Sequence, residues 1–400
     1  HATGRQARHR AFAFRDNSRR WCRSTLGIRS GKGLLLFSGV GLAAELTMRL
    51  VADIGGTNSR LALSRAGTVV TGSIQSFSNA DWAGLEGIIE AYLASQGTIP
   101  KEMVIALAGP VHGDKGALTN RNWLIEADKL AGLFDVEQVH LLNDLTALGY
   151  SVPHLDAGQV QQIDQGRVQS SSFAQSLVIG IGTGFNVSPV YQNGRAIVCP
   201  AVEAGHVTLP SGIANLLSKF DLDASRYPTV EDLFSGRGFA SFCQHVCADR
   251  SLDGPTAIAA YGKSDSETIT YAVDGYAALL GQLSRDLSLA YLPVSGLYFA
   301  GSVARSVLGK SPDKFVKVLQ EPSKIMRTDA LPLLVIEDDT AALRTRELIG
   351  EETLLWGSDY PHTDSTWPCS TQVLDEMFED YSVETRDKIT RTNVASLYSL

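Results

Sequence analysis

Short apolar runs alternate with longer amphipathic segments over most of the chain. From residue 48 the pattern predicts strands over residues 49–53, 59–65 and 69–77, with Gly67 at the second turn, which is typical of an antiparallel meander. Further on, the pattern predicts strands over residues 103–108, 117–119 and 138–142 and helices over residues 82–95, 126–134 and 144–150. This alternation of strands and helices indicates an α/β fold.

A second series starts in the same way near residue 176. The pattern predicts strands over residues 176–180, 185–191, 196–199, 297–300 and 333–336 and helices over residues 211–219, 238–248 and 266–291. Asn193-Gly194 is a strong hairpin signal between two of these strands. The polar, Gln- and Ser-rich residues 154–175 are predicted to form a surface excursion. Two similar series indicate a duplicated architecture with a ligand between two lobes.

The first strand runs into the sequence Asp53-Ile54-Gly55-Gly56-Thr57-Asn58. Two glycines let the backbone turn tightly, and successive N–H groups in such a turn form a concavity that binds anions. A carboxylate at residue 53 suits a Mg²⁺ ion carried by a nucleotide. The stretch is therefore predicted to be a nucleotide phosphate loop, with a simple hairpin turn as the alternative.

Two further turns repeat this chemistry. Gly182-Thr183-Gly184 follows the first strand of the second series, and Gly301 lies where the strand over 297–300 meets a helix. The two Gly-Thr turns are placed to hold one nucleotide from opposite sides. Small residues around Gly301 suit an adenine ring or ribose lying on the backbone.

Asn143-Asp144 lies where an apolar strand ends and a helix begins. Ligands gather at the carboxyl ends of strands in α/β folds, so Asp144 is placed to act as a general base. Phosphoryl transfer to an alcohol needs such a base to orient the hydroxyl and accept its proton. The alternative is that Asp144 only caps the helix.

Several polar side chains suit a neutral polyol, because its hydroxyls both donate and accept hydrogen bonds. They are Asn120, Glu203, His206 and Glu231. Each has a plainer interpretation: His206 as a buried, hydrogen-bonded histidine and Glu231 as an acid in the first turn of a helix.

Composition narrows the class of protein. The 400 residues are 44% hydrophobic and 20% charged, as in soluble globular proteins, and the net charge of −8 argues against a nucleic-acid partner. No apolar run reaches the roughly 18–20 residues that cross a bilayer, so no membrane partner is expected. Five scattered cysteines do not form a disulfide framework, and Cys243 and Cys247 are interpreted as packed thiols rather than zinc ligands.

The first 47 residues differ from the rest, with eight Arg and one Lys against Asp16 and Glu45. The apolar residues 33–44 after Arg19-Arg20 imitate a secretion signal, and a transit peptide is a second interpretation. We favour a disordered arm that comes from upstream or vector-like translation, with Met48 as the natural start and a cytoplasmic location.

Taken together, these motifs resemble those of bacterial glucokinase over residues 48–344. The resemblance implies a two-lobed, actin-like (ribonuclease H-like) sugar kinase fold with a ligand cleft between the lobes, phosphorylation of glucose to glucose 6-phosphate in glycolysis, ATP and Mg²⁺ as cofactors, and it allows a homodimer. It implies that Asp144 is the catalytic base. The implied glucose contacts are Asn120, Asn143, Glu203, His206 and Glu231; the implied nucleotide contacts are Asp53, Ile54, Gly55, Gly56, Thr57, Asn58, Gly182, Thr183, Gly184 and Gly301.

The chain also departs from that pattern. Ser302 stands where a second glycine is usual, and Ala204 where glycine is common. From residue 345 the family's Gly-rich closing helix is replaced. Residues 346–400, with Trp356-Gly357-Ser358-Asp359, resemble the last segment of a metal-dependent amidohydrolase barrel, but the His-x-His ligands are absent and one carboxylate cannot build a catalytic metal site.

We therefore expect an arm over residues 1–47, a small lobe over 48–150, a large lobe over 151–344 and an inactive fragment over 345–400. Three alternatives stay open. The first is a kinase for mannose, fructose or an N-acetylhexosamine, the second is a sugar-binding regulator without catalysis, and the third is a hydrolase in the tail.

Overall fold

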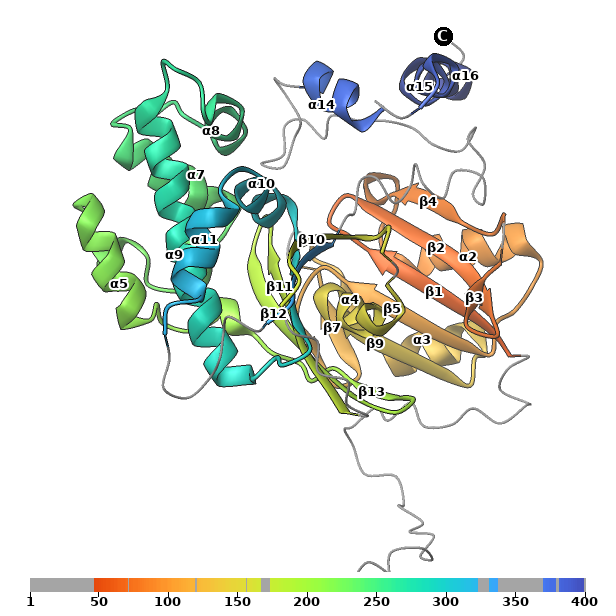
Figure 1. Cartoon of the computed structure of the whole chain (residues 1–400). Coiled ribbons are helices and arrows are strands. Elements are labelled where there is room, and N and C mark those ends of the chain that lie inside the picture. Colours follow the sequence, from red (N-terminus) through yellow and green to blue (C-terminus); the bar gives the residue numbers. More distant parts are fainter. Residues whose placement is uncertain are drawn as a thin grey trace, which may run out of the picture. The chain divides into compact units, whose positions relative to one another are not determined.

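The computed structural model describes residues 47–70, 72–118, 121–155, 157–166, 173–322, 331–336, 370–378 and 381–398. The arm over residues 1–46, Asn120 and the Gly-Ser-Asp stretch at 357–359 lie outside the described residues. Two separate sheets carry most of the described chain, one before Asp144 and one after Val160 (Figure 1).

The first sheet has the strand order β3-β2-β1-β5-β9, and β4 pairs with β2. Its strands are β1 (Met48–Ile54), β2 (Asn58–Arg65), β3 (Thr68–Val69), β4 (Gln75–Ser78), β5 (Glu102–Leu107) and β9 (Gln138–Asn143). β1 is antiparallel to β2 and parallel to β5, and β5 is parallel to β9. The carboxyl ends of β1, β5 and β9 therefore meet at one edge, which places Asp53 and Asp144 at the same end of the sheet.

One predicted strand of this sheet is wrong. Residues 69–77 do not form a single strand, because β3 ends at Val69 and β4 begins at Gln75. Gly72, at φ +80°, breaks the extended conformation. The buried Ser73 hydroxyl fixes the break by donating to the Val70 carbonyl oxygen at 2.7 Å.

Two helices and a small sheet complete the first half of the described chain. They are α2 (Leu85–Gln96), α3 (Ala127–Phe134), β6 (Val111–His112), β7 (Lys115–Ala117) and β8 (Leu124–Glu126). Ile88 and Tyr92 of α2 and Leu50 and Ile105 of the sheet are fully buried in one core. Burial stabilises each such side chain by roughly 1.5–3 kcal/mol.

The second sheet has the order β10-β15-β14-β11-β12-β13. Its strands are β10 (Val160–Asp164), β11 (Phe173–Ile181), β12 (Phe185–Asn193), β13 (Ala196–Val198), β14 (Gly296–Ala300) and β15 (Leu333–Ile336). The prediction that residues 154–175 form only a surface excursion is wrong. β10 pairs antiparallel with β15, because that strand otherwise presents an unpaired edge.

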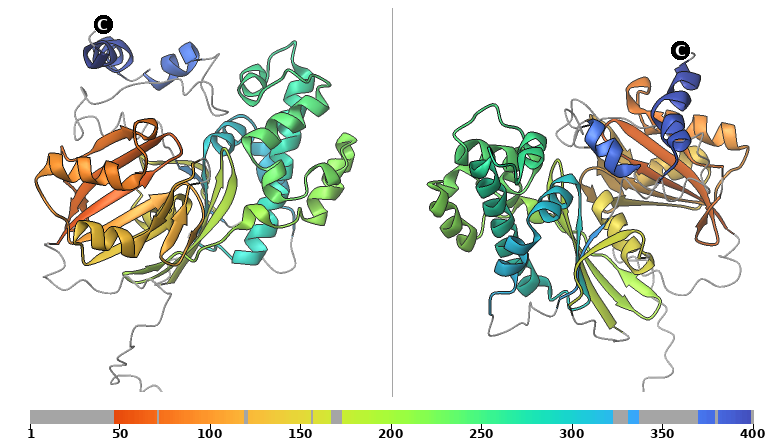
Figure 2. Two further views of the ribbon diagram at one scale, coloured as in Figure 1. Left: turned by 180° about the vertical axis from the view of Figure 1, so that it is seen from behind. Right: turned by 45° about the horizontal axis from the view of Figure 1, so that its top comes forward.

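Both faces of the second sheet are covered (Figures 1 and 2). Leu177, Ile179 and Ile181 of β11 pack among the helices on one face. Val178, between them, packs on the other face with residues of α4 (Asp144–Ser151). A strand buried on both faces reads as a continuous apolar run, which is what the sequence shows.

Seven α-helices lie between β13 and β15 in the described chain. They are α5 (Ser211–Leu217), α6 (Val230–Leu233), α7 (Gly236–Val246), α8 (Gly254–Ala260), α9 (Glu267–Tyr291), α10 (Ser302–Lys310) and α11 (Pro312–Leu319). The predicted helices at 211–219, 238–248 and 266–291 are confirmed with ends shifted by one or two residues. We did not predict α8, although Asp253 caps it and Pro255 opens its first turn.

The last described residues form α14 (Ser370–Met377), α15 (Val383–Asp387), a π-helical turn η8 (Lys388–Thr392) and α16 (Asn393–Tyr398). Phe378 and Ile389 are buried in a small apolar cluster of their own.

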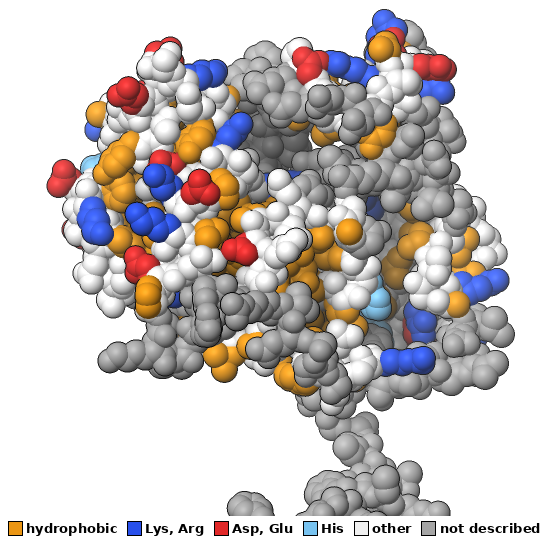
Figure 3. All heavy atoms as spheres, viewed as in Figure 1, with side chains coloured by type: hydrophobic (Ala, Val, Ile, Leu, Met, Phe, Trp, Pro, Cys, Tyr) orange, Lys and Arg blue, Asp and Glu red, His pale blue; other side chains and the backbone are white. Residues whose placement is uncertain are grey.

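On the face seen in Figure 3, acidic and basic side chains are interspersed. Among the described helices, none combines the length and apolar character that a bilayer crossing requires.

Candidate active site

The first glycine turn joins β1 to β2 and is held from behind. The Gly55 carbonyl oxygen accepts a hydrogen bond from Asn79 Nδ2 at 2.8 Å, and the Thr57 carbonyl oxygen accepts one from the Asn79 amide at 2.8 Å. The Gly56 carbonyl oxygen accepts one from Arg121 Nε at 2.7 Å. All three carbonyls of the turn are therefore fixed on the protein side.

The amide groups of this turn point the other way. A trans peptide places its N–H opposite its C=O, so fixing the Gly55 and Gly56 carbonyls directs the amides of Gly56 and Thr57 outward. No described residue accepts a hydrogen bond from either amide. Two outward N–H groups in succession form a site for a phosphate oxygen.

Asp144 begins α4, directly after β9. The cap of this helix is Asn143, whose Oδ1 accepts from the amides of Leu145 at 3.1 Å and Thr146 at 3.4 Å. The N-cap is therefore Asn143 and not Asp144, although Asp144 Oδ1 also accepts from the Leu145 amide at 2.7 Å. Asn143 Nδ2 also donates to the Gly109 carbonyl oxygen at 3.2 Å, which ties α4 to the end of β5.

Asp144 is exposed at the surface as a residue, but many protein atoms lie around its carboxylate and remove part of its hydration. Desolvation raises the pKa of Asp144, and the negative charge of Asp53 raises it further. Hydrogen bonds from the Leu145 amide and from Asn143 oppose these effects without cancelling them. A carboxylate with a raised pKa binds a proton more strongly, so Asp144 is a stronger base than an ordinary aspartate.

The second glycine turn is held by close backbone contacts. The Gly182 amide donates to the Gly184 carbonyl oxygen at 3.0 Å, and the Gly236 amide donates to the Gly182 carbonyl oxygen at 2.8 Å. Gly301 has φ +90°, and a Cβ there would lie 2.4 Å from the Ile181 carbonyl oxygen. Gly182 and Gly301 are therefore neighbours, which brings together two of the predicted nucleotide segments.

Glu231 lies beside this second turn, in the first turn of α6 as the plainer interpretation had it. Its Oε2 accepts from the Phe185 amide at 3.1 Å, and its Oε1 pairs with Arg237 Nη2 at 2.8 Å. A Cβ on Gly184 would lie 2.8 Å from Glu231 Oε2. The carboxylate thus reaches the second turn but is already partnered by a cation.

Glu203 precedes a 3₁₀ turn, η3 (Ala204–His206), and His206 is its last residue; both are exposed. The interpretation of His206 as a buried histidine is therefore wrong. Asn186 holds this turn on β12: its Oδ1 accepts from the Ala204 amide at 3.0 Å, and its Nδ2 donates to the Val202 carbonyl oxygen at 2.7 Å.

Helix α4 links Asp144 to the second sheet. A Cβ on Gly180 would lie 2.7 Å from Leu145 Cδ1, and one on Gly149 would lie 2.4 Å from Ser188 Oγ. Glycine at these two positions lets the helix that carries Asp144 pack directly on β11 and β12. The structure therefore brings Asp144, Asp53 and the first turn together, and packs the helix of Asp144 against the strand that leads to the second turn.

The two departures at small residues are accommodated. Ser302 is the first residue of α10 and Ala204 is the first residue of η3, and neither has a positive φ. A Cβ is tolerated at both positions for this reason.

No group of three or more potential metal ligands occurs among the described His, Cys, Asp and Glu side chains. Asp53 is exposed, and its Oδ2 lies 3.8 Å from Arg60 Nη1. Oxygen ligands that are few and exposed fit a hydrated Mg²⁺ that arrives with a nucleotide better than a resident ion.

The cysteine pair of α7 is packed as predicted. Cys243 is fully buried in the core of the second half, and Cys247 packs against this core. Burial raises the pKa of both thiols, so they stay protonated at neutral pH.

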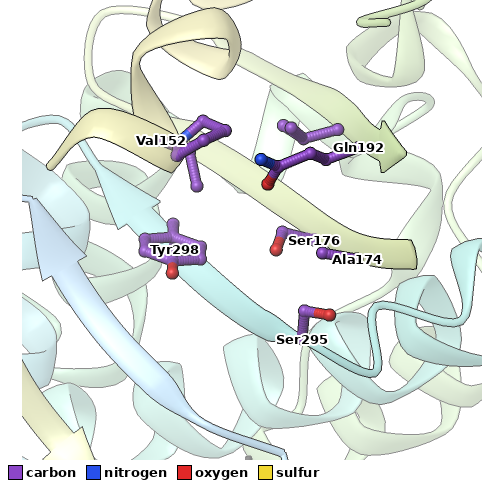
Figure 4. A pocket seen from close by; sticks show the side chains of 8 residues that line it. Val152, Ala174, Ser176, Gln192, Ser295 and Tyr298 are labelled. Carbon is purple, nitrogen blue, oxygen red and sulfur yellow. The ribbon is translucent and has the colours of Figure 1, made fainter. Parts of the chain in front are cut away.

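A cavity of about 120 Å³ lies apart from these residues. Ala174 and Ser176 of β11, Tyr298 of β14 and Val152 are among its lining residues (Figure 4). Ala174 and Ser176 lie in the first half of β11, whereas the second glycine turn follows the end of that strand. The cavity is therefore separate from the candidate active site.

Two residues at the first turn escaped the sequence analysis. Asn79 is completely buried, and Arg121 stacks over Trp123 with Cζ 5.5 Å from the ring centroid. Their partners are backbone carbonyls 24 and 65 positions away, a pairing that leaves no local pattern. Asn120 lies outside the described residues.

Comparisons with known proteins indicate the family of the chain. A family model described as Glucokinase matches residues 50–351, and one described as Amidohydrolase matches residues 337–400. The glucokinase of Brucella abortus biovar 1 (strain 9-941) is 28% identical over 312 residues, covering 74% of this chain and 88% of the relative.

Solved structures give the same picture. The glucokinase from an Antarctic psychrotroph has a TM-score of 0.63 at 26% identity and covers 76% of this chain and 97% of its own. The glucokinase from Balamuthia mandrillaris in complex with glucose has a TM-score of 0.57 at 19% identity, with coverage of 74% and 91%, and supports the fold alone.

Proposed function

Because this chain belongs to the glucokinase family, we propose that it transfers the terminal phosphoryl group of ATP to the 6-hydroxyl of glucose, with Asp144 as the general base. The chain is a sugar kinase with the two-lobed, actin-like fold. The observation that carries the proposal is the position of Asp144. It is the first residue of α4, at the same end of the sheet as the first glycine turn, and the charge of Asp53 raises the pKa of its carboxylate.

Asp144 would accept the proton of the attacking hydroxyl. Its raised pKa favours this, since a base is most effective when its pKa approaches the working pH. Asn143 keeps the carboxylate in place by capping the helix and by holding the end of β5.

The two glycine turns would bind the nucleotide. The free amides of Gly56 and Thr57 would bind phosphate oxygens, and the neighbouring backbones of Gly182 and Gly301 would border the adenosine. A nucleotide-bound Mg²⁺ near Asp53 would neutralise phosphate charge. Asn120, Asn143, Glu203, His206 and Glu231 remain predicted sugar contacts.

The test of the base is Asp144→Asn. We expect kcat to fall roughly 10²- to 10⁴-fold, because proton transfer is lost while shape is kept. Glucose binding, measured by calorimetry, should persist. Turnover is measured as ADP release against a panel of hexoses, which also separates glucose from mannose, fructose and N-acetylhexosamines.

The matched control is Asp135→Asn. Asp135 is exposed and lies at the left-handed C-cap of α3, where asparagine is well tolerated. It should leave kcat unchanged. Near-normal turnover in the Asp144 variant would refute the assignment.

The remaining predictions concern the chain's surroundings. We propose a cytoplasmic location, because the reaction consumes ATP, and we keep the homodimer as a prediction. We also propose that residues 345–400 have no catalysis of their own, because the His-x-His pair of a barrel metal site is absent from the sequence.

A further inference from the structure

We infer that Arg121 is a positioning residue that fixes the phosphate-binding conformation of the first glycine turn. This inference rests on the proposed function, in that it assigns the turn to nucleotide phosphates. It concerns a side chain that contacts the turn from the protein side rather than the nucleotide itself.

Arg121 binds one backbone carbonyl of the turn and one of the segment that supports the turn. Its Nε donates to the Gly56 carbonyl oxygen at 2.7 Å, and its Nη1 donates to the Asn79 carbonyl oxygen at 3.0 Å. Asn79 in turn holds the Gly55 and Thr57 carbonyl oxygens. One guanidinium therefore fixes the middle of the turn and the segment that fixes its two sides.

The guanidinium is itself immobilised. It lies over the Trp123 ring, and both of its hydrogen bonds are partly buried. A planar fork with several donors can hold two carbonyls at once, which a lysine ammonium on a flexible chain does less well. Stacking on an aromatic ring adds a cation–π contribution.

The consequence for phosphate binding comes from peptide geometry. The Gly56–Thr57 peptide has glycine on one side, so little but its hydrogen bond prevents it from flipping. A flip would turn the Thr57 N–H, which no described residue binds, away from the phosphate side. Holding the Gly56 carbonyl keeps that donor in place before the nucleotide arrives.

The sequence position of Arg121 fits this role. It lies 65 residues from Gly56, in the segment before β8, so the contact joins two separate parts of the first half of the chain. The cation also lies next to a turn that would receive the negative charge of a phosphate, which adds a favourable long-range interaction.

The test compares ligands that do and do not carry phosphates. We expect Arg121→Gln to weaken ATP binding by about tenfold, the scale of one charge-assisted hydrogen bond, with adenosine binding unchanged. Arg121→Lys should bind ATP with an affinity between those of the unaltered chain and the glutamine variant, because lysine keeps the charge and one donor. Binding is measured by calorimetry on the full chain without sugar.

The matched control is Arg195→Gln, the same change at an exposed hairpin position. It should leave both ligands unaffected. Equal weakening of ATP and adenosine, or unchanged ATP binding, would overturn the inference. If Arg121→Gln does not fold, the lysine variant decides by the same ATP-to-adenosine comparison. Because no sugar is present, the result is independent of whether Asp144 proves to be the base.

Discussion

The two glycine turns look alike in sequence but are fixed by different means. Two residues hold the first turn: the side chains of Asn79 and Arg121 bind the Gly55 and Gly56 carbonyls, and the backbone amide of Asn79 binds the Thr57 carbonyl. Among the described residues, the second turn has only backbone hydrogen bonds of its own and little space: a Cβ on Gly301 would lie 2.4 Å from the Ile181 carbonyl oxygen, and one on Gly184 would lie 2.8 Å from Glu231 Oε2. A Gly-Thr pattern therefore predicts where a turn lies but not what maintains it.

The difference has a practical meaning for substitutions. The first turn should fail when a distant hydrogen-bond donor is removed. The second should fail when a methyl group is added. The predictions that follow separate these two mechanisms, from the largest expected effect to the smallest.

Gly301→Ala should be the most disruptive. The residue has φ +90°, and its new Cβ would lie 2.4 Å from the Ile181 carbonyl oxygen. Left-handed strain together with overpacking predicts a loss of about 3–5 kcal/mol in the free energy of unfolding. Urea unfolding followed by circular dichroism measures it.

Gly182→Ala is the control for this change. Its Cβ would lie 4.0 Å from Gly301 Cα, an ordinary contact, so we expect a loss below about 1 kcal/mol. Equal losses in both variants would show that space does not fix the second turn.

Asn79→Ala should cost less but act on the first turn alone. The completely buried side chain donates to the Gly55 carbonyl oxygen and accepts from Ser59 Oγ at 2.6 Å. Leaving both partners unsatisfied predicts a loss of about 2–3 kcal/mol, together with weaker ATP binding. Asn215→Ala, at an exposed position in α5, should change neither quantity. Unaltered stability in the Asn79 variant would contradict the side-chain mechanism.

The smallest effect concerns charge. Asp53, at the first turn, raises the pKa of Asp144, whereas Glu231, at the second, is not among the main causes of that shift. Asp53→Asn should therefore lower the Asp144 pKa, and Glu231→Gln should leave it in place. Carboxyl-carbon NMR titration of the ligand-free enzyme measures both, and a reversed order would refute the placement of Asp144 beside the first turn.

The raised pKa of Asp144 also predicts how the stability of the fold changes with pH. Since desolvation and Asp53 raise the folded-state pKa of Asp144 above its unfolded value, ionisation of Asp144 weakens the fold. The penalty is absent below the unfolded pKa and complete above the folded pKa. Asp144→Asn should therefore have a higher Tm than the unaltered chain near neutrality, and the difference should vanish on acidification.

Much of the fold could be predicted because the elements are locally consistent. The second half of the strand that becomes β11 is apolar, and α9 has a clear helical period, so both were found within a few residues. β10 was missed because its pairing with β15 is a contact across more than 160 residues. The break at Gly72 was missed because Ser73 fixes it through tertiary hydrogen bonds.

The site divides in the same way. The glycines at strand ends and the acid after β9 can be recognised from the residues next to them in the sequence. The structure places Asp53 and Asp144 close enough for the charge of Asp53 to raise the pKa of Asp144. The supporting residues Asn79, Arg121 and Asn186 have no motif, because their partners are backbone atoms far along the chain. The roles of the predicted sugar contacts stay predictions.

Gly149 has a consequence for Asp144, the proposed base, at the other end of its helix. A Cβ on Gly149 would lie 2.4 Å from Ser188 Oγ of β12. Gly149 comes five residues after Asp144, which is about 7 Å along the axis of α4. We therefore expect a side chain at position 149 to displace α4 and to move the Asp144 carboxylate from its place after β9. A glycine outside the predicted site is in this way expected to set the position of the carboxylate that we propose as the base.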